Sequence, residues 1–125
     1  MASVVDEAEL YWRYVAESSS TDRATRLRAR DVTGELGANF EALSERIRLG
    51  GAPAAEAVIA LAASARSAEQ VGFLAAGPCE DLHSVDAASF IGIVLPAIAP
   101  DLARRLADGM ILTPRDEERI RASLR

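Results

Sequence analysis

The sequence predicts an all-α protein, and three observations support that prediction. Half of the 125 residues are hydrophobic, but only 5% are aromatic. Alanine, the residue with the highest helix propensity, occupies 25 positions. Apolar side chains recur at spacings of three and four residues, which places them on one face of a helix. A β-rich fold would need more Val, Ile, Thr and Tyr than this chain contains.

The length and the even composition predict a single helical domain over residues 1–125. We expect a compact bundle of six or seven helices, arranged in roughly antiparallel pairs around a central apolar helix. Neither a low-complexity linker nor a tandem repeat of fixed period divides the chain.

The first part of the chain predicts three helices of different character. Residues 6–17 begin with acids, which favour a helix N-terminus, and SSST at 18–21 breaks the pattern. Residues 22–32 are strongly charged and offer one large apolar side chain before their end, Leu27, so we expect this helix to be weakly anchored. Gly34 and Gly37 are expected to bend or end it. The third helix carries one apolar stripe, formed by Leu36, Phe40, Leu43 and Ile47.

The middle of the chain predicts the central helix. LGGAP at 49–53 is typical of a turn, and residues 54–66 are apolar nearly all round, as expected of a helix surrounded by others. Ser67 and Gln70 form a capping-box pattern for the next helix. We expect that helix to stop at Gly77, and a short new helix to begin with Pro78 in its first turn.

The remaining segments are predicted to be helical as well. Ser84 or Asp86 caps the apolar segment 87–99, which could be a strand but is better read as a helix, because Gly92 can relax around the ring of Pro96. A kink is expected there. Residues 100–111 form an amphipathic helix, and Thr113 precedes a last helix in which acids come before arginines.

The charge pattern disfavours nucleic acid as a partner. The net charge is −5 and the pI is near 4.9, whereas nucleic-acid binding depends on cationic contacts with phosphates. All 14 basic residues are arginine. Arg23, Arg26 and Arg30 would share a helical face, where they could contact phosphate or an acidic protein. We favour a solvated face paired with Asp22 and Asp31.

The sequence predicts a cytoplasmic protein that does not enter the membrane. Cys79 is the only cysteine, which excludes an intramolecular disulfide, and the acidic start is unlike a signal peptide. The longest uncharged run, residues 87–100, is too short to span a bilayer and contains Pro96.

The stretch GPCEDLHS at 77–84 contains the chain's single histidine and invites a chemical interpretation. Glu80 and His83 could contribute to a metal site, and Cys79 and His83 could approach each other as a catalytic pair. We favour a structural role, in which Glu80 and Asp81 accept the free N–H groups of a helix start. We therefore predict no catalytic residue, no metal ligand and no cofactor.

Trp12 is the only tryptophan, and Tyr11 and Tyr14 lie close to it in the sequence. Such residues are common in interface hot spots, but they are also natural anchors for an alanine-rich core, which is the role we favour. If the domain binds a partner, the candidate binding residues are Trp12, Glu80 and Asp81.

The stretch LAAGPCEDL resembles a family of small bacterial helical domains of unknown function with the signature Ala-Gly-Pro-Leu-Glu-Asp-Leu-Leu. Gly77, Pro78, Glu80, Asp81 and Leu82 match that structural motif, whereas Cys79 and His83 stand where the signature has leucine. The resemblance is clearest over residues 55–95. It implies an α-helical domain and no established activity.

Together these features predict a non-enzymatic protein-interaction module, comparable with immunity proteins that cover a toxin. Its acidic surface would suit a basic protein partner. Two alternatives remain. One is a self-assembling structural protein that forms a homodimer through an uncovered apolar face of helix 36–47 or 87–99. The other is a small hydrolase or metal protein that uses Glu80 and His83.

Overall fold

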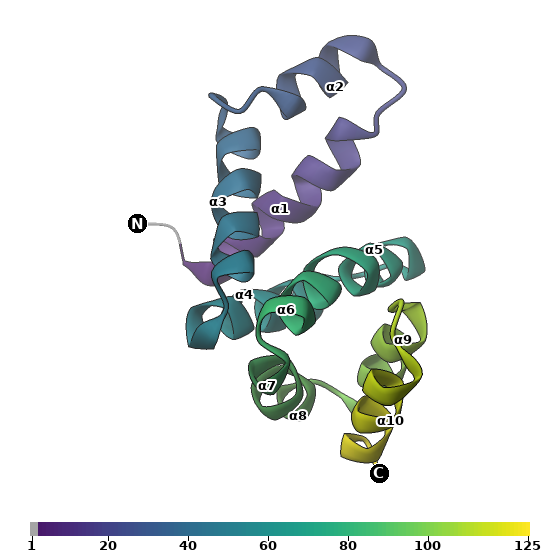
Figure 1. Cartoon of the computed structure of the whole chain (residues 1–125). Helices are drawn as coiled ribbons and strands as arrows, with labels where there is room; N and C mark the ends of the chain where they lie inside the picture. The colour runs from purple at the N-terminus through teal and green to yellow at the C-terminus, as the bar shows by residue number, and fades with distance from the viewer. Residues whose placement is uncertain (1–2) are drawn as a thin grey trace.

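The structure is a computed structural model that describes residues 3–125. All regular secondary structure in this range is helical, which confirms the predicted all-α bundle. The helical segments form eight continuous stretches, one more than the upper number expected. Figure 1 shows the two halves of the chain, with α1 to α3 above and α5 to α10 below.

Three helices form the upper half of Figure 1: α1 (Val4–Ser18), α2 (Arg23–Arg30) and α3 (Glu35–Leu49). α2 joins the upper ends of α1 and α3. An ion pair links α1 to α3: the Arg46 guanidinium of α3 donates to the Glu7 carboxylate of α1 at 2.7 Å. The Asn39 side chain also donates to the Glu7 carbonyl oxygen at 2.9 Å.

Gly37 lies inside α3 and does not end α2, contrary to expectation. A Cβ atom at this position would overlap the backbone carbonyl of Asp31, the residue that follows α2. Glycine therefore lets the α2–α3 connection pass directly against the first turn of α3.

α4 (Gly51–Ser64) is the central helix, as predicted. It packs against α1, α3 and the later helices 68–74 and 87–94. Its buried side chains are small or branched: Ala54, Ala55, Ala57, Val58, Leu61 and Ala62. Because these side chains are short, neighbouring helices can approach α4 closely on several sides.

Asp86 fixes the start of α4. Gly50 and Gly51 have φ angles of 73° and 79°, a conformation that favours glycine. Because α4 already begins at Gly51, the connection from α3 is shorter than the predicted turn at 49–53. The Gly51 N–H donates to the Asp86 carboxylate at 2.8 Å. The same carboxylate accepts the Ser89 N–H at 3.2 Å and so caps the following helix, as predicted for Asp86. One side chain thus joins two helix starts.

The predicted helix break at Gly77 is wrong. α5 (Ala68–Leu74), a π-helical turn η1 (Ala75–Cys79) and α6 (Glu80–Val85) form one continuous helix, seen as an unbroken ribbon in Figure 1. An α-helical Pro78 would clash with the carbonyl four residues earlier, and the wider π turn gives its ring room. Ser67 caps α5 as predicted, but the Gln70 side chain accepts from the Arg66 N–H rather than completing the capping box.

Segment 87–97 is a helix, as favoured over a strand. It comprises α7 (Ala87–Ser89), a second π-helical turn η2 (Phe90–Val94) and α8 (Leu95–Ala97). The Leu95 N–H donates to the Phe90 carbonyl, five residues back. Pro96 lies just after this π turn, whereas Pro78 lies inside the first one, so each proline occurs in or beside a π turn.

The last two helices, α9 (Pro100–Gly109) and α10 (Pro114–Ser123), begin where the sequence predicts. Thr113 caps α10 by accepting the Asp116 N–H at 3.2 Å. α9 packs against α5 and η1, and Gly109 lies so close to Ala75 that a Cβ would come within 2.8 Å of it. Among residues 3–125 no helix has the length and apolar character needed to cross a membrane.

Candidate functional site: an aromatic groove between α1 and α5

The aromatic side chains of this protein are concentrated in one place. Five of the six lie in a single cluster that joins α1, α3 and α5: Tyr11, Trp12, Tyr14, Phe40 and Phe73. Tyr14 stacks on Phe40 with ring centroids 4.0 Å apart, and Tyr11 stacks on the same ring at 4.9 Å. Phe73 meets both Tyr11 and Trp12 edge to face at 6.2 Å.

Trp12 occupies the core position favoured from sequence. Its exposed fraction is 5%, and its indole N–H donates to the Leu61 carbonyl and the Ser64 hydroxyl, each at 3.1 Å. Both acceptors lie on the central helix α4. The indole therefore anchors α1 to α4 with its polar atom satisfied, and only its edge reaches the surface.

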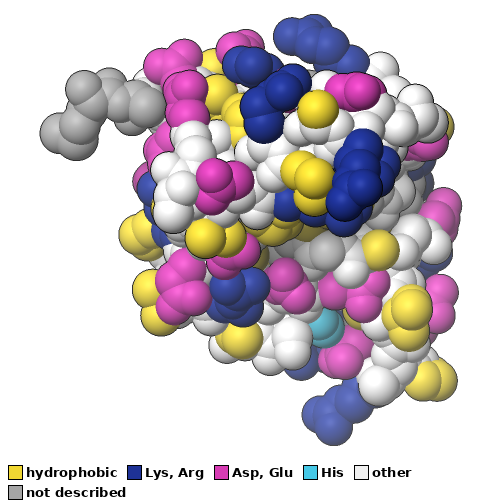
Figure 2. Space-filling view, turned by 90° about the horizontal axis from the view of Figure 1, so that it is seen from above, with side chains coloured by type: hydrophobic (Ala, Val, Ile, Leu, Met, Phe, Trp, Pro, Cys, Tyr) yellow, Lys and Arg dark blue, Asp and Glu magenta, His cyan; other side chains and the backbone are white. Residues whose placement is uncertain are grey.

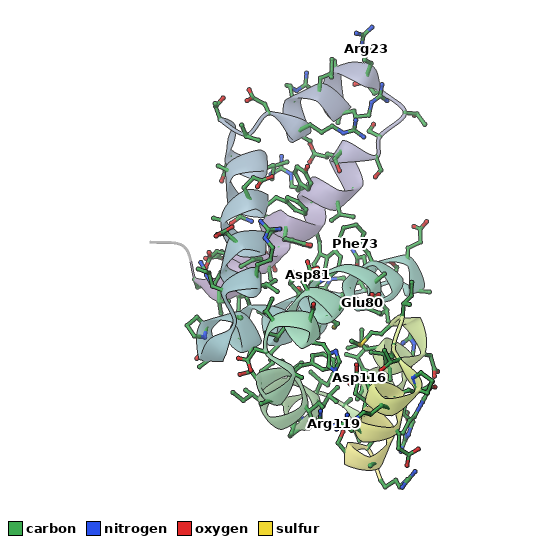
Figure 3. All side chains as sticks on the ribbon, in the orientation of Figure 1. Arg23, Phe73, Glu80, Asp81, Asp116 and Arg119 are labelled. Carbon is green, nitrogen blue, oxygen red and sulfur yellow. The ribbon has the colours of Figure 1, made fainter. Side chains whose placement is uncertain are left out.

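Phe73 is the member of the cluster that solvent reaches most directly. Its exposed fraction is 41%, and Figure 3 shows it on α5 below α1. It forms one wall of a groove of about 650 Å³ between the C-terminal half of α1 and the start of α5. The groove is lined by Trp12, Val15, Ala16, Ser19, Ser67, Glu69, Gln70 and Phe73. It is thus an apolar surface with a polar rim.

The groove carries one formal charge, the carboxylate of Glu69 in the first turn of α5. Ser67 and Gln70 are already engaged in the cap of that helix, through the bond from the Gln70 N–H to the Ser67 hydroxyl at 3.1 Å. The N-cap hydrogen bond of α5 therefore holds these two rim residues of the groove in place. Such a surface suits an apolar side chain flanked by a cation.

A second, smaller hollow of about 400 Å³ lies between α6 and the start of α10. Glu80, His83 and Asp116 line it, together with Ile111, whose exposed fraction is 87%. One carboxylate oxygen of Glu80, Oε2, is buried and has no hydrogen-bond partner within residues 3–125. Figure 2 shows acidic side chains around the single histidine on this face.

Glu80 and Asp81 do not accept free N–H groups at a helix start, so that predicted role is wrong. The helix runs on through them, and no side-chain cap bond is made at the start of α6. Figure 3 shows that the two side chains point to different sides, Glu80 toward α9 and α10 and Asp81 toward α1. The Tyr11 phenol is buried, and the nearby charge of Asp81 adds to burial in raising its pKa above the ordinary value.

Cys79, the last residue of the π turn η1, is fully buried. Burial raises the pKa of its thiol well above the ordinary value, and the charge of Glu80 raises it further. The group is therefore a neutral thiol that solvent does not reach, unlike an activated cysteine nucleophile. His83 packs edge to face against Phe90 at 5.9 Å instead. Within residues 3–125 no three His, Cys, Asp or Glu side chains are placed to share a metal ion.

The arginines of α2 are not paired with Asp22 and Asp31, so that expectation is also wrong. Asp22 accepts from the hydroxyl and N–H of Thr25 at 2.6 and 2.9 Å. Asp31 accepts in the same way from Thr33, at 2.7 and 2.9 Å. These bonds lower the pKa of both carboxyls. Asp22 therefore caps the start of α2, and Asp31 orders the connection that follows the helix.

Comparison of the chain with protein-family models, with curated protein sequences and with solved structures finds no match. The resemblance to the helical family with the Ala-Gly-Pro signature therefore stays a prediction.

Sequence reasoning missed Phe73 as a site residue. Nothing in the local pattern of residues 67–77 shows that this helix packs against α1. The signal that could have found it is composition. Phe73 is one of only six aromatic residues, and such scarce side chains are candidates for a surface shared with Trp12.

Proposed function

We propose that this protein is a non-enzymatic protein-interaction module that binds a partner protein through the groove between α1 and α5. The observation that supports this most strongly is the exposure of Phe73 beside the edge of Trp12, at the rim of an otherwise packed aromatic cluster. Aromatic side chains held rigidly in this way supply contact area at little entropic cost.

Charge supports a basic segment as the occupant of the groove. The net charge of −5 steers cationic partners toward the protein, and Glu69 gives the groove rim a local acceptor. An immunity-like role, in which the protein covers a basic target, agrees with that chemistry. The free thiol of Cys79 suits the reducing cytoplasm, where we place the protein.

The test is site-specific cross-linking in the cells that make the protein. A photoreactive phenylalanine analogue replaces Phe73 in one variant and Leu49 in a matched control. Leu49 has an exposed fraction of 77% but lies at the end of α3, away from the groove. We expect a discrete cross-linked protein from position 73 only.

A second variant distinguishes specific docking from nonspecific binding. Glu69→Arg reverses the only charge in the groove and leaves the aromatic surface intact. We expect it to reduce the cross-linked product from position 73 by about tenfold if the partner segment is basic. Equal labelling from positions 73 and 49, or no product at 73, would show that the groove is not a binding site.

A further inference from the structure

α2 has the largest net charge of the described helices, and no carboxylate pairs with its guanidinium groups. Four of its eight residues are arginines, Arg23, Arg26, Arg28 and Arg30. Within residues 3–125 none of them forms an ion pair, because the carboxylates of Asp22 and Asp31 accept from Thr25 and Thr33 instead. Elsewhere six of ten arginines form ion pairs: Arg13, Arg46, Arg48, Arg104, Arg121 and Arg125.

The same helix exposes apolar surface among these charges. Ala29 is its one buried residue, whereas Leu27 has an exposed fraction of 53% and Val32, just beyond the helix, 61%. At 100° per residue Leu27 falls about 40° from Arg23 and about 60° from Arg30 on the helix surface. The leucine is therefore flanked by guanidinium groups on the face turned away from the rest of the protein.

The figures show this face as an open surface. Arg23 lies at the outer end of α2 and points away from the other helices in Figure 3. Figure 2 views the protein from the side on which α2 lies, and its upper part shows arginine side chains with apolar side chains between them. Arg26 is half-buried and donates to the Ser20 carbonyl oxygen at 2.9 Å, so Arg23, Leu27 and Arg30 form the exposed part of this face.

We propose that this face of α2, defined by Arg23, Leu27 and Arg30 with Arg26 at its edge, binds an acidic segment of a partner protein that also presents an apolar side chain. Carboxylates would pair with the guanidinium groups, which have a planar geometry suited to them. The apolar side chain would cover Leu27. This surface is separate from the groove, and the proposal does not depend on the proposed function.

Other polyanions match the face less well. Single-stranded nucleic acid is held by aromatic side chains that stack on bases, and α2 has none, since five of the six aromatics lie in the cluster and Phe90 is buried. An anionic bilayer requires a broad apolar face, and this eight-residue helix offers one leucine. An acidic protein segment uses both the charge and the leucine.

The experiment measures fluorescence anisotropy of the whole protein with labelled peptides of about 14 residues. The first peptide carries glutamates and leucines at helical spacing. The second has the glutamates but no leucine, and the third has lysine in place of each glutamate of the first. We expect the first to bind most tightly, the second about tenfold more weakly, and the third not at all. Raising the salt from about 50 to about 300 mM should weaken binding.

Two double variants locate the site. Arg23→Glu with Arg30→Glu should weaken binding of the first peptide by at least about tenfold. Arg115→Glu with Arg119→Glu changes the net charge equally, at two exposed arginines of α10 that form no ion pair in the described chain, and should change binding by less than about twofold. Circular dichroism checks that both variants keep their helix content.

Leu27→Ala should remove most of the preference for the first peptide over the second, because the peptide leucine then has no leucine on α2 to pack against. The proposal is wrong if no acidic peptide binds, or if both double variants weaken binding equally. It is also wrong if a single-stranded oligonucleotide or phosphatidylglycerol vesicles bind through α2 more tightly than the first peptide.

Discussion

α4 and α2 relate to the rest of the protein in opposite ways. α4 buries six of its fourteen residues, and α2 buries one of its eight. α4 packs against helices on several sides, whereas α2 packs mainly against α1 and α3 and is capped at its start by Asp22. Packing therefore places few constraints on the exposed residues of α2, and the proposed binding face uses these residues.

The largest expected effect is a core truncation in α4. Leu61→Ala removes a fully buried side chain next to the indole of Trp12 and should lower the free energy of unfolding by about 2–5 kcal/mol. The control Leu49→Ala removes the same atoms from an exposed site and should change it by less than about 0.5 kcal/mol. Urea denaturation measures both. Similar losses in the two variants would contradict the central position of α4.

The next-largest effect on stability distinguishes Gly37 of α3 from Gly72 of α5. A Cβ at Gly37 would overlap the Asp31 carbonyl and come within 2.7 Å of its carbon, so Gly37→Ala should cost about 1–3 kcal/mol. Gly72→Ala places its Cβ in open space on α5 and should stabilise the protein by about 0.5–1 kcal/mol, because alanine favours the helix. Thermal unfolding distinguishes the opposite signs.

Local sequence patterns predicted most of the helices but not the continuation of α5 into α6. Gly77 and Pro78 locally signal a helix end, but Leu74, Cys79 and Leu82 on either side of that signal are all fully buried. Burying them on one continuous helix outweighs the local preference of glycine and proline to end it, and the π turn makes this possible. Tertiary packing thus overruled a local signal.

The candidate site was less predictable for a related reason. Trp12 was identified by its rarity, but its neighbour Phe73 comes from a helix distant in the sequence, and periodicity does not show which helices meet. The α2 arginines were expected to pair with Asp22 and Asp31. Nearby Thr25 and Thr33 hydroxyls and N–H groups satisfy those carboxylates instead. The short cap bonds formed within a turn were preferred to ion pairs between flexible side chains.

A smaller effect compares a long-range cap with a local one. Asp86 joins the starts of α4 and α7, so Asp86→Ala should lower the melting temperature by several degrees, and Asp22→Ala, which frees only α2, should lower it less. Equal decreases would show that α2 unfolds together with the core.

The pH dependence of Asp86 has a defined sign. Hydrogen bonds from the Ser89 side chain, the Gly51 N–H and the Ser89 N–H hold the pKa of Asp86 below its ordinary value of 3.8. The carboxylate therefore stabilises the fold above that pH, and the contribution is lost as the pH falls through the lower folded-state pKa. The difference in melting temperature between wild type and Asp86→Ala should be full at pH 7 and shrink below about pH 3.8. A difference that grows in acid would contradict the assignment.

The smallest expected effect is at Leu27, and it tests the interpretation of α2 directly. Because the side chain is half exposed, Leu27→Ala should change the free energy of unfolding by less than about 0.5 kcal/mol in urea denaturation. Hydrogen exchange should likewise show α2 amides opening far more often than those of α4. A loss above about 1 kcal/mol would mean that Leu27 packs against the protein, and the reason for assigning it to a partner would disappear. A residue that is neutral for stability but necessary for peptide binding is one whose apolar surface is used only in the complex.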